Sequence, residues 1–118
     1  MKAYFINAKH EYIVELNVRD YEHKKELIEA KRLDLYPYQI KGNDIWIDEE
    51  SQLKEYSYDF VIDGFVVHGN AIILSEDNKG ESTSVKNLTV QELISRVRFL
   101  GKQYVDHSKL QFKVIEWN

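Results

Sequence analysis

The histidine at position 68 is the side chain of this sequence whose surroundings are most suited to chemistry. His68 lies between Gly64 and Gly69, and Asn70 comes directly after Gly69. Glycine allows the backbone to approach a ligand closely, and it also allows a sharp bend between two strands. With Asp63 as the carboxylate that orients it, His68 would serve as a general base. The competing interpretation is a bulge or turn that links two strands. It is favoured over a small enzyme that uses His68 and Asp63.

Other catalytic and metal-binding patterns are missing from the sequence. There are no cysteines, and the four histidines lack the i, i+4 spacing of a helical metal site. The acidic clusters at 44–50 and 76–81 do not have the spacing of an EF-hand loop. Neither a Gly-x-Ser-x-Gly elbow nor a glycine-rich nucleotide loop is present. We therefore expect no enzymatic activity, no cofactor and no metal.

Composition predicts one folded domain over residues 1–118. The chain is 43% hydrophobic and 31% charged, with one proline, which excludes a disordered or low-complexity polymer. A formal charge of −4 has the wrong sign for a general nucleic-acid binder. No apolar run approaches the length of a membrane span, and no signal peptide is recognisable at the start. We expect a cytoplasmic protein that does not enter a membrane.

Aromatic residues are crowded into the middle of the chain. The crowded residues are Tyr36, Tyr38, Trp46, Tyr56, Tyr58 and Phe60. Such side chains anchor a protein partner, stack on a base or fill a core. Strand alternation places Tyr36 and Tyr38 on the face opposite Leu33 and Leu35, so the tyrosines face out if the leucines point to the core. Trp46 either packs against a helix layer or is exposed for contact. We take Tyr36, Tyr38, Trp46, His68 and Asn70 as the candidate binding residues.

Hydrophobic periodicity predicts an α+β fold. Alternation predicts strands at 2–7, 11–18, 33–41, 44–48, 58–63 and 110–114. The continuous apolar run 71–74 indicates a strand that is covered on both faces. Asp20 would cap a helix over 21–30, and the Thr89-x-x-Glu92 capping box begins a second helix that Gly101 ends. The prediction is a mostly antiparallel sheet of about five to seven strands, with two helices, the C-terminal one (about 90–100) packed on the sheet.

Several segments together resemble a known family. These segments are MKAYFIN at 1–7, GNDIWIDEESQLK at 42–54, YDFVIDG at 58–64, GNAIIL at 69–74, GES at 80–82 and the segment 88–100. They are similar to small uncharacterised proteins of tailed bacteriophages and of mobile elements of low-GC Gram-positive bacteria. The resemblance covers about residues 1–100 and implies a phage accessory protein without assigned catalytic residues.

The resemblance and the missing catalytic patterns lead to two functional hypotheses of different kinds. In the first, the protein binds and inhibits a defence or regulatory protein of the bacterial host, without enzymatic activity. In the second, it is a sponge that sequesters a nucleotide immune signal, with aromatic stacking on the base. Backbone N–H groups at 64–70 or near Gly80, with Arg96, would then meet the phosphates. The proline-containing edge and the C-terminal strand leave a homodimer open.

Overall fold

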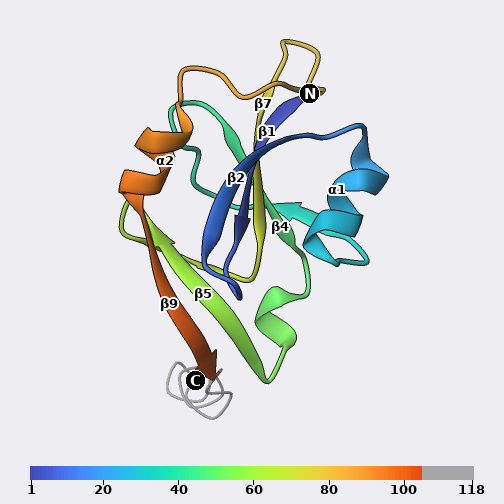
Figure 1. Cartoon of the computed structure of the whole chain (residues 1–118). Coiled ribbons are helices and arrows are strands. Elements are labelled where there is room, and N and C mark those ends of the chain that lie inside the picture. Colours follow the sequence, from blue (N-terminus) through green and yellow to red (C-terminus); the bar gives the residue numbers. More distant parts are fainter. Residues whose placement is uncertain (105–118) are drawn as a thin grey trace, which may run out of the picture.

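The computed structural model describes residues 1–104, and the strand expected at 110–114 lies outside the described residues. This part of the chain is an α+β structure built on two antiparallel sheets (Figure 1). The fold class expected from the sequence is therefore confirmed, including two helices and a mostly antiparallel strand arrangement.

The larger sheet has strand order β2-β1-β7-β4-β3, and β8 pairs with β7 beside this path. Its strands are β1 (Lys2–Asn7), β2 (Tyr12–Asn17), β3 (Leu33–Leu35), β4 (Asp44–Asp48), β7 (Ala71–Glu76) and β8 (Ser82–Thr83). The hairpin β1–β2 and the strands β4 and β7 are the elements that alternation and the apolar run predicted. The expected extended segment 33–41 is a strand only to Leu35, where it forms the sheet edge before Pro37.

The smaller sheet has strand order β6-β5-β9. It consists of β5 (Tyr56–Ile62), β6 (Phe65–His68) and β9 (Val97–Tyr104). Asp63 and Gly64, both with positive φ (49° and 87°), form the two-residue turn between β5 and β6. The glycines around His68 predicted a bulge or turn. In the structure, residues 65–68 form β6, a complete strand of the hairpin with β5.

The second helix is shorter than predicted. Helix α2 covers Val90–Arg96, and Thr89 caps it by accepting a hydrogen bond from the Glu92 N–H. The expected continuation to residue 100 is wrong, because the chain becomes β9 at Val97 and pairs with β5. Gly101, with φ of 75°, lies next to an irregularity in the β5–β9 register instead of ending a helix. The first helix, α1 (Tyr21–Ile28), is capped by Asp20 as predicted.

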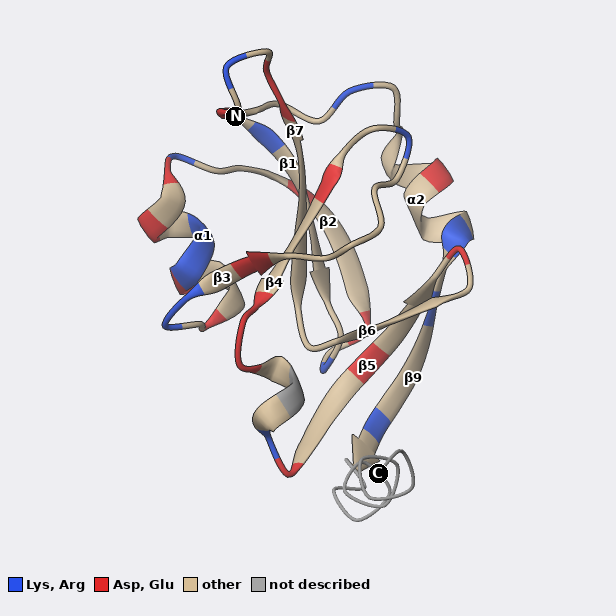
Figure 2. Ribbon diagram, turned by 180° about the vertical axis from the view of Figure 1, so that it is seen from behind, with Lys and Arg blue, Asp and Glu red and all other residues tan. Residues whose placement is uncertain are grey.

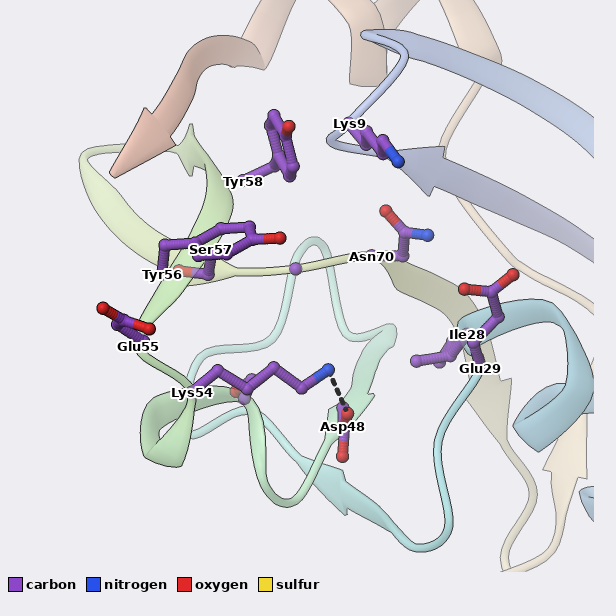
Figure 3. A pocket seen from close by; sticks show the side chains of 12 residues that line it. Lys9, Ile28, Glu29, Asp48, Lys54, Glu55, Tyr56, Ser57, Tyr58 and Asn70 are labelled. Carbon is purple, nitrogen blue, oxygen red and sulfur yellow. Dashed lines mark ion pairs between the residues drawn. The ribbon is translucent and has the colours of Figure 1, made fainter. Parts of the chain in front are cut away.

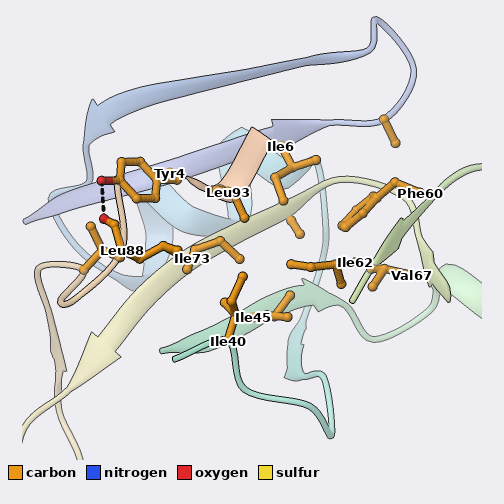
Figure 4. Close-up of a cluster of buried hydrophobic side chains, with 13 residues drawn as sticks. Tyr4, Ile6, Ile40, Ile45, Phe60, Ile62, Val67, Ile73, Leu88 and Leu93 are labelled. Carbon is orange, nitrogen blue, oxygen red and sulfur yellow. Dashed lines mark hydrogen bonds between the residues drawn. The ribbon is translucent and has the colours of Figure 1, made fainter. Parts of the chain in front are cut away.

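Strand β7 is packed on both faces, as its continuous apolar run predicted. Ile73 belongs to the larger core, between the large sheet and the layer made by the small sheet and α2 (Figure 4). That core also holds Phe60, Ile62 and Leu93, which are all 0% exposed. Ile72 and its neighbours on the other face pack with α1 in the smaller core. A short 3₁₀ helix, η1 (Ser51–Leu53), joins β4 to β5.

Basic and acidic residues are interspersed along the ribbon (Figure 2). Both helices carry basic and acidic side chains, and Arg96 on α2 forms ion pairs with Glu92 and Asp63. The basic residues at 24–32 and 96–98 do not form a uniform positive helix face, because Lys24 is buried and Arg96 is paired with Glu92 and Asp63.

Candidate functional site

A cavity of about 520 Å³ lies beside β5 (Figure 3). Side chains from five separate segments line it. They are Lys9 after β1, Ile28 and Glu29 at the end of α1, Asp48, Ser51, Lys54 and Glu55 around η1, Tyr56, Ser57 and Tyr58 on β5, and Gly69 and Asn70 before β7. Its volume falls in the range of about 300–1,000 Å³ that is typical of small-molecule pockets.

Two tyrosines of β5 form one wall of this pocket. Tyr56 and Tyr58 lie on the same side of the strand, with ring centroids 6.2 Å apart and planes at 86°. Cations already lie over both rings. Lys102 Nζ is 4.0 Å from the Tyr56 centroid, and Lys9 Nζ is 5.9 Å from that of Tyr58. Tyr56 is 43% exposed, so much of its surface is available to a ligand.

The floor of the pocket is polar. Asp48 is buried and forms an ion pair of 3.2 Å with Lys54, drawn as a dashed line in Figure 3. Ser51 and Ser57 are also buried, at 4% and 7% exposure. Beside this neutralised pair, the lining carries Lys9 together with the carboxylates of Glu29 and Glu55.

A buried hydrogen-bonded cluster lies behind this floor. Ser57 donates its hydroxyl proton to Asp59 Oδ1 at 2.5 Å, and Asp59 Oδ2 is 3.0 Å from His68 Nδ1. Asp59 and His68 are directly opposite each other in the β5–β6 ladder, which brings their side chains together. Asp59 is 3% exposed, whereas the His68 side chain is 30% exposed.

The expected pairing of His68 with Asp63 is wrong. Asp63 lies in the β5–β6 turn, and its Oδ2 accepts hydrogen bonds from Tyr38 Oη and Arg96 Nη1. The carboxylate that contacts His68 is Asp59, which the sequence analysis did not select. The signal that could have found it is the Asp-Gly turn, since that turn fixes which residues of the two strands face each other.

His68 also lines a smaller cavity of about 160 Å³. Its other walls include Tyr36, Pro37, Ile47 and Val66, and Ser51 is shared with the larger pocket. Asn70 lines the larger pocket, so three of the five selected residues, Tyr36, His68 and Asn70, line one of these two cavities.

Tyr36, Tyr38 and Trp46 are engaged in contacts within the fold. Tyr36 Oη donates to the Val66 carbonyl at 2.6 Å, and Tyr38 Oη donates to Asp63. Both tyrosines are half-buried and pack against the larger core. They would face out only if Leu33 and Leu35 pointed to the core, and this condition is not met, because Leu35 is 42% exposed. The pKa of Tyr36 is raised by burial, and that of Tyr38 is raised chiefly by its hydrogen bond to Asp63.

Trp46 packs against the helix layer, the first of the two alternatives for this residue. It contacts the smaller core, and Lys24 Nζ of α1 is 3.8 Å from its ring centroid. Burial lowers the pKa of Lys24, an effect that the nearby Asp44 carboxylate partly opposes. The use of Tyr36, Tyr38 and Trp46 as anchors for a host protein stays a prediction.

The phosphate-binding groups expected for a nucleotide sponge are not gathered at the pocket. Arg96 is paired with Glu92 and Asp63, and neither it nor Gly80 is among the lining residues. Gly69 and Asn70 do line it, but the Gly69 N–H donates to the Tyr58 carbonyl.

The fold and the pocket define a two-sheet α+β protein with an aromatic-walled cavity of ligand size. No family model matches the chain, and neither the curated proteins nor the solved structures give a match. Within residues 1–104, no group of three or more His, Cys, Asp or Glu side chains is placed to hold a metal ion. The described helices include none that is long and apolar enough to cross a membrane.

Proposed function

We propose that this protein binds a nucleoside or nucleotide in the pocket beside β5 and sequesters it without converting it. The observation that carries the proposal is the pair of tyrosine rings on one wall of a cavity of about 520 Å³. An aromatic ring that stacks on a base contributes about 1–3 kcal/mol by alanine substitution.

The charges of the lining support a ligand with few charges of its own. Asp48 and Lys54 neutralise each other, and the remaining acidic groups, Glu29 and Glu55, outnumber Lys9. A ligand with several phosphates would meet these carboxylates, since like charges repel. A nucleoside or a monophosphate fits this balance better, with the base against the tyrosines and the phosphate near Lys9.

Isothermal titration calorimetry with nucleosides and their 5′-monophosphates tests the proposal. We expect saturable binding of at least one of these compounds, with a stoichiometry of one. Mass spectrometry of the released compound should show it unchanged, because sequestration needs no turnover.

A matched pair of variants links the binding to the pocket. Tyr56→Ala should weaken binding by about 5–150-fold, the equivalent of the stacking energy. Tyr12→Ala is the control, since Tyr12 is 44% exposed against 43% for Tyr56 and lies on β2, outside the pocket lining. The proposal would be refuted if none of the nucleosides and monophosphates bound, or if the two variants weakened binding equally.

A further inference from the structure

Strand β2 is an edge of the larger sheet that is open to pairing with another chain. Within residues 1–104 it pairs only with β1, and in Figure 1 it lies at the front of the molecule, where neither helix crosses over it. The other edge strands of the two sheets are short, irregular or covered. β3 has three residues, β9 has an irregular register beside Gly101, and the Val66 carbonyl of β6 accepts a hydrogen bond from Tyr36 Oη. Such features discourage edge pairing, whereas β2 is regular over six residues and has one charged side chain, Glu15.

The backbone hydrogen bonds of β1 show how the groups of β2 are oriented. Met1 and Val18 exchange two hydrogen bonds, of 2.9 and 2.8 Å, so they form a hydrogen-bonded pair in register with the β1–β2 ladder. Lys2, the next residue, bonds away from β2, since its N–H donates to Ser84 Oγ and its C=O accepts from the Val85 N–H. The two kinds of pair alternate along an antiparallel ladder, so every second residue of β2 directs its backbone groups away from β1.

The free edge of β2 combines outward backbone groups with an exposed apolar row. The outward N–H and C=O groups belong to the odd-numbered residues of the strand, which are Ile13, Glu15 and Asn17. No other group of residues 1–104 bonds to them. The even-numbered side chains of Tyr12, Val14 and Leu16 share the face of the sheet that packs on α1. Tyr12 is 44% exposed and Val14 is 39% exposed, so α1 leaves part of this row uncovered.

We propose that two copies of this chain associate through β2, in an antiparallel β2–β2 pair centred on Val14. In this pair Val14 lies opposite the second copy's Val14, and Tyr12 lies opposite the second copy's Leu16. The outward groups of Ile13 in each copy face those of Glu15 in the other, and each of these two pairs exchanges two hydrogen bonds. The larger sheets of the two copies then form one continuous sheet.

Charge and backbone conformation select this register over its neighbours. A pair centred on Glu15 would place two carboxylates directly opposite each other, which destabilises a sheet. A pair centred on Ile13 would need Glu11 as the extended partner of Glu15, but Glu11 has a φ of 57° and precedes the strand. A shift by one residue would put the apolar rows of the two copies on opposite faces. Because the strand complements itself in the register centred on Val14, the occupant of this edge is a second copy of the chain.

The contact is small, so the dimer should be weak. Each copy contributes one strand of six residues, whereas a standard interface has about 20–30 residues a side. We expect a dissociation constant of about 10–500 μM. None of the residues that line the pocket beside β5 lies on β2, so ligand binding and self-association should be independent of each other.

Analytical ultracentrifugation of the full chain between about 5 μM and 1 mM tests the association. The average mass should rise from that of the 14.0 kDa monomer towards that of a dimer over this range. Val14→Lys places two ammonium groups opposite each other and should keep the chain monomeric. Leu35→Lys is the matched control, because Leu35 is 42% exposed on β3, at the other edge of the same sheet. A wild-type chain that stays monomeric throughout, or a Val14→Lys variant that dimerises as well as Leu35→Lys, overturns the proposal.

A single introduced cysteine reports the register, because the chain has no cysteine of its own. In the proposed pair the Cα atoms of the two Val14 residues are about 4.5 Å apart, which is within the range of a disulfide. The Cα atoms of the two Glu15 residues are diagonal neighbours at about 7–8 Å, which is outside it. Val14→Cys should therefore form a covalent dimer on mild oxidation at least about tenfold faster than Glu15→Cys or the control Leu35→Cys. If Val14→Cys cross-links no faster than either of these variants, the proposed pair is wrong.

Discussion

The hydroxyl of Tyr38 links three parts of the fold, and its removal should weaken that link measurably. Tyr38 Oη donates to Asp63 Oδ2, the same oxygen that Arg96 Nη1 reaches at 3.3 Å. The Tyr38 ring stacks on Phe65 with centroids 4.5 Å apart and planes at 21°. The segment after β3, the β5–β6 turn and α2 therefore meet at one carboxylate.

Tyr38→Phe keeps the stacked ring and removes only the hydrogen bond. A hydrogen bond to a charged group contributes about 1.5–3 kcal/mol, but the Asp63 side chain is 24% exposed, and solvent reduces the value. We expect a loss of about 1 kcal/mol, which corresponds to a fall in Tm of about 3–6 °C for a domain of this size. Differential scanning calorimetry measures it, and Tyr56→Phe is a control at a tyrosine that is 43% exposed.

The pH dependence of the free energy of unfolding is a second test of the hydrogen bond between Tyr38 and Asp63. The pKa of Tyr38 in the folded protein lies above the ordinary value of 10.0, first because of the hydrogen bond to Asp63. This stabilisation is fully present below pH 10.0 and is lost as the pH rises through the folded-state pKa. The free energy of unfolding should thus fall less steeply above pH 10 in Tyr38→Phe than in the wild type. An unchanged Tm together with an unchanged alkaline slope would show that the hydroxyl does not hold these elements together.

Two further predictions concern the cores. Leu93 is 0% exposed, so Leu93→Ala should lower the free energy of unfolding, measured by urea denaturation, by about 2–5 kcal/mol. The neighbouring Ile94 is 50% exposed, and Ile94→Ala should change this free energy by no more than about 0.5 kcal/mol. Equal losses in the two variants would contradict the assigned helix face. Burial lowers the pKa of Lys24 below 10.5, so wild-type stability should rise between that lowered pKa and pH 10.5. Lys24→Met removes this pH dependence, so the free energy of unfolding of the variant relative to the wild type should decline over the same pH interval. If the difference between the two proteins stays constant with pH, the amine of Lys24 is not desolvated.

Local patterns in the sequence were sufficient for much of the fold. Strands β1, β2 and β4 follow from alternation, and Asp20 and Thr89 mark the starts of both helices. The end of α2 did not follow, because Val97 and Leu100 fit a helical stripe and a strand equally well. Pairing with β5, some 40 residues earlier in the chain, decides in favour of the strand. Such a distant partner is invisible to a local pattern.

The site was predictable only in part, for the same reason. Asn70 was selected for its place beside Gly69, and it does line the pocket. Tyr56 belonged to the aromatic cluster but carried no feature that distinguished it from Tyr36, which packs inward. What separates these two tyrosines is the tertiary position of their strands. The sequence therefore indicated an aromatic binding protein more readily than it indicated which aromatic residues face a ligand.

The position of β7 determines when the larger sheet can assemble during synthesis. Its two main neighbours, β1 and β4, are not paired with each other and both precede it in the chain. Until residues 71–76 leave the ribosome, one edge of each of these strands has no partner, and open strand edges favour association with other chains. A nascent chain whose synthesis stalls before this point should be prone to aggregate. Rapid translation of the codons up to residue 76 would therefore protect the protein while it is made.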